Sequence, residues 1–209
     1  MRMHLKSPQI RKVMTKKNLL IFLIGLMVVS IIIGIIFFLS LSHDEELLTQ
    51  KQITSYFNNE LLEHSVLLNL KKSLFNNIFS VILIWTLGIS VIGIVFILFL
   101  FFMQYFTLGF TLSSIFLKFK LKGLLATVFY LIPHKLSSLF LVLYISYHAI
   151  CFSYNLLLFL FWDREINMHI IIRKYLKNLV IGLIMAIIIS IMEVFITPFV
   201  LKTFTNLIK

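Results

Sequence analysis

The sequence predicts an all-α fold, a polytopic membrane bundle of about five transmembrane helices with a broken helix near Pro133. The first observation is composition, since 60% of the 209 residues are hydrophobic and the mean hydropathy is +1.03. No soluble domain of this length has so much apolar surface, so the bilayer must be its solvent. The second is that apolar runs of about 20 residues, the length of one membrane crossing, recur along the chain. The third is that charged residues gather between these runs.

Residues 1–18 form a basic arm that contains no acidic residue. The basic side chains are those of Arg2, Lys6, Arg11, Lys12, Lys16 and Lys17. A positive cluster beside an apolar run favours a cytoplasmic N-terminus. Charge alone would also fit a nucleic-acid-binding arm. The apolar run begins at once, so we expect no nucleic-acid partner.

The first span is predicted over residues 19–41. This run is longer than the apolar region of a signal peptide, and no small-residue cleavage site follows it. Residues 42–77 come next and are acid-rich beside the arm, so we expect them outside the cytoplasm. In this segment Ile53, Phe57 and Leu61 recur at helical spacing and predict an apolar face for partner or bundle contact. The segment is too small to be an enzyme domain.

Residues 73–117 carry no charged side chain. One helix of that length would extend about 67 Å, more than twice the hydrocarbon core. The stretch must therefore fold back, and we predict spans over 78–102 and 105–117 with a turn near Gln104. This arrangement places the basic loop 118–122 outside, against the positive-inside tendency. The alternative is an interfacial cytoplasmic helix over 104–122.

The next apolar run, residues 123–132, is too short to cross a membrane. Pro133 and His134 interrupt it, and residues 136–161 are long enough for the fourth span. Non-helical backbone at membrane depth must be shielded by protein. We expect His134 to bond a carbonyl that the proline leaves free.

The fifth span is predicted over residues 179–201, after a basic and therefore cytoplasmic loop over 162–178. Glu193 is the only charged residue in this span. A carboxylate there costs a few kcal/mol and must face other helices or a wet cavity. Pro198 follows and is expected to bend or end the helix. Candidate hydrogen-bond partners of Glu193 on other spans are Ser90, Thr111 and His148.

Small residues mark sites where helix backbones can approach closely in lipid. Gly88 and Gly93 lie in the second predicted span, and Gly109 lies in the third. Packing within this bundle is the preferred interpretation. An interface of a homo-oligomer is the alternative.

The sequence contains no recognisable catalytic or metal-binding pattern. It has six histidines without an HExxH motif and a single cysteine, Cys151. It has no nucleophile elbow, phosphate-binding loop or dinucleotide fingerprint. We therefore expect no enzymatic activity, no metal and no cofactor.

Several stretches together resemble the stage II sporulation protein M family. They are LIWTLGISVIG over 83–93, GFT over 109–111, LIPH over 131–134 and EVFITPF over 193–199. Many relatives have a glycine after the Pro-His pair and an acid a few residues later. This chain has Lys135 and Ser138 at those places. A role of that acid therefore cannot be transferred.

The resemblance implies a non-enzymatic multi-pass protein of the cell membrane, in contact with membrane lipid. Such proteins look like scaffolds that anchor peptidoglycan hydrolases, stage II sporulation proteins D and P, at the septum during engulfment in sporulation. The competing hypothesis is a transport component for a small solute or ion. Glu193 and the broken helix near Pro133 would then line the path.

Overall fold

The computed structural model describes residues 16–42, 66–161 and 168–208, with a few positions between 45 and 51. It gives only the backbone for residues 16, 66–67, 118–135 and 196–208. All regular structure in these ranges is helical, which confirms the predicted fold class. The helices are α1 (Lys16–Leu39), α3 (Val66–Gly88), α4 (Gly93–Phe161) and α5 (Met168–Ile208).

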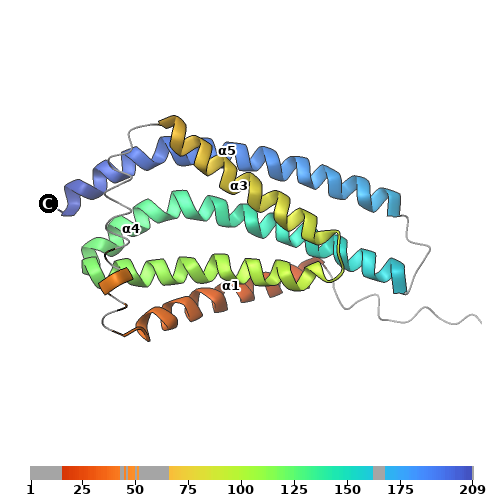
Figure 1. Cartoon of the computed structure of the whole chain (residues 1–209), viewed down its shortest axis with the longest axis horizontal. Coiled ribbons are helices and arrows are strands. Elements are labelled where there is room, and N and C mark those ends of the chain that lie inside the picture. The colour runs from red at the N-terminus through yellow and green to blue at the C-terminus, as the bar shows by residue number, and fades with distance from the viewer. Residues whose placement is uncertain are drawn as a thin grey trace, which may run out of the picture.

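Helix α4 consists of two antiparallel arms, Gly93–Leu117 and Leu136–Phe161. The chain reverses between them at one end of the bundle, and the arms then run side by side (Figure 1). The Tyr105 hydroxyl of the first arm donates a hydrogen bond of 2.9 Å to the Leu139 carbonyl of the second. The backbone stays helical through residue 133. Where the sequence predicts a broken helix, the structure therefore has a helical chain that reverses its direction.

Four helical stretches are long and apolar enough to cross a membrane, by length and composition. They are Lys17–Leu39, Gly93–Leu117, Leu136–Phe161 and Met168–Phe195. The chain is therefore a multi-pass membrane protein. Helix α3 is not among the four, and its first half carries Lys71 and Lys72. It nevertheless packs against both α4 and α5 along the bundle.

The predicted spans over 78–102 and 105–117 have the wrong boundaries. The chain turns at residues 89–92, and α4 runs without interruption through Gln104. The physical reason lies at Gly93, where a Cβ atom would collide with the Leu87 backbone. Only glycine permits this tight reversal. The Ser153 hydroxyl then holds the turn by donating a bond of 2.8 Å to the Ser90 carbonyl.

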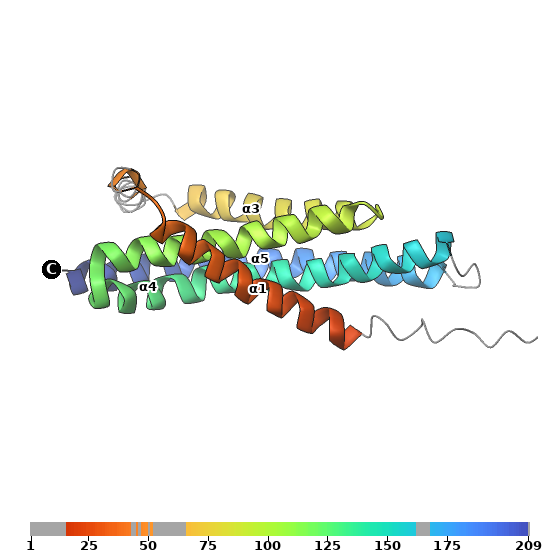
Figure 2. The same cartoon turned by 90° about the horizontal axis from the view of Figure 1, so that it is seen from below.

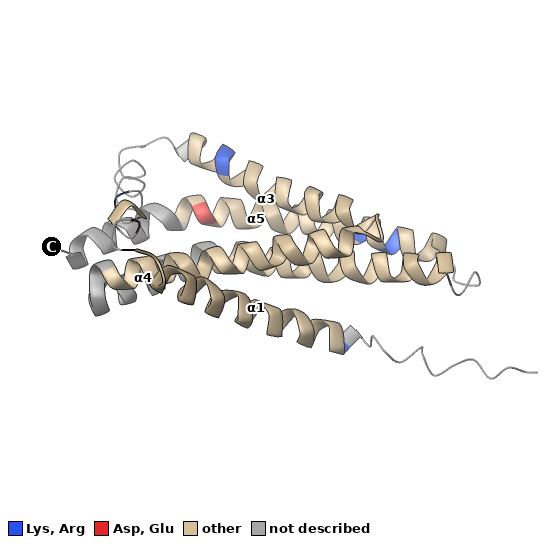
Figure 3. Ribbon diagram, turned by 60° about the horizontal axis from the view of Figure 1, so that its bottom comes forward, with Lys and Arg blue, Asp and Glu red and all other residues tan. Residues whose placement is uncertain are grey.

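The two ends of the bundle carry different segments. Helix α1 begins at the end where the turn 89–92 lies, where α4 ends and where α5 begins (Figures 1 and 2). The opposite end holds the end of α1, the start of α3, the reversal of α4 and the end of α5. Among the described residues, the ribbon positions of Lys, Arg, Asp and Glu lie toward these ends and leave an uncharged stretch between them (Figure 3).

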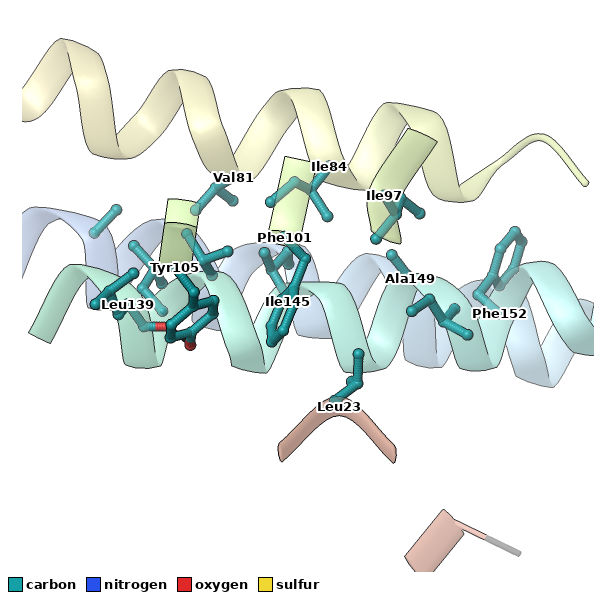
Figure 4. Close-up of a cluster of buried hydrophobic side chains, with 14 of the residues drawn as sticks. Leu23, Val81, Ile84, Ile97, Phe101, Tyr105, Leu139, Ile145, Ala149 and Phe152 are labelled. Carbon is teal, nitrogen blue, oxygen red and sulfur yellow. Dashed lines mark hydrogen bonds between the residues drawn. The ribbon is translucent and has the colours of Figure 1, made fainter. Parts of the chain in front are cut away.

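The interior is an apolar core to which every helix contributes. Leu23 of α1, Val81 of α3 and Phe101 and Ile145 of α4 are fully buried in it (Figure 4). Helix α1 crosses α4 at a close contact, because a Cβ on Gly109 would collide with the Ile31 carbonyl. In lipid, dispersion between closely packed backbones is a main source of helix association.

Candidate functional site

A polar cluster around Glu193 joins three helices inside this apolar bundle. Glu193 lies on α5 and is only 7% exposed. Its neighbours are Ser73 and Asn77 of α3 and Ser138 of the second arm of α4. Asn77 is as deeply buried as the glutamate. The cluster therefore meets the requirement that an intramembrane acid face protein.

Both carboxylate oxygens of Glu193 accept hydrogen bonds from other helices. The Ser138 hydroxyl donates to Oε1 over 2.6 Å. Oε2 accepts from the Ser73 hydroxyl and, over 3.2 Å, from the Asn77 amide. The same amide donates over 2.9 Å to Ser190, whose hydroxyl donates to its own helix. A buried network in which each member has partners rigidifies a core.

Local helix geometry explains why these side chains converge. Ser73 and Asn77 are four residues apart on α3, and Ser190 and Glu193 are three apart on α5, so each pair lies on one helix face. Helix α3 packs against α5, which brings the two faces together. Ser138 comes from the start of the second arm of α4 and closes the cluster.

The predicted partners of Glu193 are wrong. Ser90 lies in the turn, and its carbonyl accepts from Ser153. The Thr111 hydroxyl bonds the carbonyl of Thr107 in its own helix, over 2.8 Å. His148 faces Asn178, with 3.0 Å between the His148 Nδ1 and Asn178 Nδ2 atoms.

Sequence reasoning missed the true partners because α3 begins at Val66, within the segment predicted to lie outside the membrane. The signal was the spacing of the polar residues. Ser73 and Asn77 have i, i+4 spacing, and this pair continues into an apolar helical run.

A pocket of about 350 Å³ lies between the two arms of α4, next to this cluster. Its lining includes Leu100, Met103, Gln104, Thr107, Thr111 and Ser138. Ser138 belongs to both features, because its hydroxyl bonds Glu193 while the residue lines the pocket. In the described part of the chain, no three His, Cys, Asp or Glu side chains converge as metal ligands would.

A hydrogen bond and ring stacking join the other end of α3 to α5. The Tyr175 hydroxyl of α5 donates over 2.7 Å to the Trp85 carbonyl, and the two rings stack with centroids 5.4 Å apart. Phe152 of α4 also stacks on Tyr175, with ring centroids 4.0 Å apart. Gly88 makes room for this contact, since a Cβ there would meet the Tyr175 hydroxyl and, at 2.9 Å, the Ala149 Cβ. Gly88 therefore serves packing within the chain.

Other residues singled out in the sequence fall outside the described side chains. Helix α5 continues past residue 198 to Ile208, so of the two expectations for Pro198, a bend or an end of the helix, the second is wrong. The side chains of Pro198, Pro133 and His134 are not among those described. The same holds for Ile53, Phe57 and Leu61 in the segment between α1 and α3, whose predicted contact face stays a prediction.

Comparison with known protein families shows to which family this chain belongs. The family model for stage II sporulation protein M matches residues 21–198. This chain belongs to that family. The match runs from α1 through the Glu193 cluster, so the bundle is the family's own domain. No curated protein and no solved structure matches the chain. The chain is thus a sporulation-related membrane protein, of a family not known for enzymatic activity.

Proposed function

We propose that this stage II sporulation protein M family member is a non-enzymatic scaffold of the cell membrane. It anchors and recruits peptidoglycan hydrolases, stage II sporulation proteins D and P, at the septum during engulfment. Its N-terminal arm lies in the cytoplasm. Support comes from the family match and from the role that the buried polar residues play in the bundle.

The observation that carries this proposal is the position of Glu193. Its two oxygens receive donors from α3 and α4, so the residue fastens three helices to one another. Interhelical hydrogen bonds in membranes contribute on the order of 1 kcal/mol each. A fastened bundle suits a protein that holds partners in fixed positions. A carrier, in contrast, needs elements with two arrangements.

The proposed contact site for the hydrolases is the segment between α1 and α3. Helix α1 ends and α3 begins at the end of the bundle opposite the start of α1 (Figure 1). If the basic arm is cytoplasmic, this segment lies on the wall side of the membrane. Peptidoglycan hydrolases work there. The apolar face of Ile53, Phe57 and Leu61 would then supply the contact.

A transport function has one observation in its favour. The pocket between the arms of α4 includes Ser138, which directly bonds Glu193. A proton or small polar solute in that pocket would thus be one side chain away from an ionisable group. The scaffold remains the better-supported proposal. Transport would require Glu193 to release its hydrogen-bond donors on α3 and α4 and bind them again in each cycle.

Affinity purification from detergent-solubilised membranes of sporulating cells tests the scaffold. We expect the wild-type chain to retain stage II sporulation proteins D and P. A variant with Ile53, Phe57 and Leu61 all changed to Ser should insert normally yet lose both. The control replaces three exposed apolar residues of α5, Ile184, Ile188 and Ile191, with Ser.

The competing transport function is measured in proteoliposomes that contain the purified chain and the trapped pH-sensitive dye pyranine. Under an imposed pH gradient, the scaffold proposal predicts no proton flux above that of empty liposomes. Two results together would contradict the scaffold and favour a transporter. One is a proton flux that is lost in Glu193→Gln, and the other is a purified chain that retains neither hydrolase.

A further inference from the structure

The first arm of α4 presents a polar amide near the middle of an apolar candidate span. Gln104 lies close to the centre of the span Gly93–Leu117, and its side chain is exposed. That side chain makes no hydrogen bond to any described residue. An unsatisfied polar group in hydrocarbon costs several kcal/mol. No described residue of this chain supplies such a partner, which leaves the amide available to a group from outside.

The residues around Gln104 have the spacing that is typical of a helix–helix contact. Leu100, Gln104, Thr107 and Thr111 follow one another at intervals of four, three and four residues. This spacing places them in one stripe, as in helices that pack along a 3.5-residue repeat. All four line the pocket between the arms of α4, so the stripe borders a groove of about 350 Å³. We call these four residues the Gln104 seam.

The other polar groups of the groove already have partners. The Thr107 hydroxyl donates over 2.8 Å to the Met103 carbonyl, and the Thr111 hydroxyl donates over 2.8 Å to the Thr107 carbonyl. Ser138 donates to Glu193. Both threonines therefore present their remaining surface for close packing. Among the described lining residues, the amide of Gln104 is left as the group that can bond an incoming helix.

We propose that the Gln104 seam joins two copies of this chain in the membrane, with the two Gln104 amides bonded to each other across a twofold axis. A carboxamide is both donor and acceptor, so it complements its own copy. Two copies with the same topology place this residue at the same depth. A twofold axis along the membrane normal then makes the seam self-complementary. This dimer does not depend on the hydrolases.

Cysteine cross-linking in native membranes tests the seam. With the native Cys151 replaced by Ser, single cysteines are introduced as Thr107→Cys and Thr111→Cys on the seam. Phe99→Cys is the control, because Phe99 is exposed on the same arm but away from the seam. Oxidation should give disulfide-linked dimers at the two seam positions and much less at Phe99. Equal yields at all three positions, no dimer, or cross-links to another protein would overturn the proposal.

The role of the amide is tested with purified chain in bicelles by energy transfer between labelled copies. Gln104→Leu should weaken dimerisation roughly threefold to twentyfold, the effect of one interhelical hydrogen bond in a membrane. The matched control is Met103→Leu, which changes the neighbouring pocket residue without a polar group. A dimer as strong in Gln104→Leu as in the wild type would refute the amide contact.

Discussion

Replacing Glu193 with leucine removes the acceptor that fastens three helices. The variant leaves the Ser73 and Ser138 hydroxyls without this acceptor, while the Asn77 amide keeps its bond to Ser190. Interhelical hydrogen bonds in membrane proteins average about 0.6 kcal/mol and reach about 1.7 kcal/mol. The loss of three such bonds should therefore lower the free energy of unfolding by about 2 kcal/mol, with an upper bound of about 5 kcal/mol.

Glu193→Gln should be far milder. The glutamine has the same size and keeps one carbonyl acceptor. Serine hydroxyls can turn to accept from its new amide, and the Asn77 amide can flip to do the same. We expect the free energy of unfolding to fall by less than about 1 kcal/mol. The matched control is Met192→Leu, since Met192 is exposed on the same helix next to Glu193.

Titration with sodium dodecyl sulfate in mixed micelles measures these differences. Trp85 is a suitable fluorophore, because it stacks on Tyr175 and reports the docking of α3 on α5. The midpoint should shift strongly for Glu193→Leu and little for Glu193→Gln. A double-mutant cycle with Ser138→Ala should give a coupling of about 1 kcal/mol. An unchanged midpoint in Glu193→Leu, or zero coupling, would refute the fastening role.

Two further predictions concern topology and helix packing. In a background without the native cysteine, single cysteines are placed at His64, Asn167 and Asn206. Membrane-impermeant thiol reagents added from outside should label the first and the last but not the one at Asn167. The reverse pattern would contradict the predicted topology. Gly109→Ala should lower the free energy of unfolding by about 1–3 kcal/mol, because its methyl group meets the backbone of α1. Gly25→Ala is its control, has open space around it, and should be neutral or stabilising. Equal effects of the two alanines in the same titration would contradict the close crossing of α1 and α4.

The fold class was predictable because the bilayer leaves few alternatives. Runs of apolar residues must become helices there, since every backbone group needs a partner within its own segment. For the same reason, Glu193 in an otherwise uncharged run had to face protein, and the structure places it between helices. Both inferences depend on solvent physics and need no knowledge of the tertiary contacts.

The position of the hairpin turn was not predictable in the same way. The stretches around Gly93 and around Gly109 both contain small residues in an apolar run, and either fits a turn. The outcome depends on tertiary contacts. Gly93 packs on the Leu87 backbone in the turn, whereas Gly109 packs on Ile31 of α1 within a continuous helix.

The partners of Glu193 depended on where the second predicted span begins. A start at residue 78 leaves Ser73 and Asn77 in the segment 42–77, whose acidic residues predict a position outside the cytoplasm. Lys71 and Lys72 lie directly before this pair in the sequence. Helix α3 tolerates them near one end, where they are exposed.

The measurement that tests the scaffold most directly is engulfment in a sporulating strain whose only copy carries Glu193→Gln. This variant keeps the fastening role but cannot ionise at position 193. The account predicts a folded protein, retention of stage II sporulation proteins D and P on purification, and normal septal wall thinning. Normal folding and normal retention of both hydrolases with no engulfment would contradict it, because the ionisable carboxyl itself would then be required.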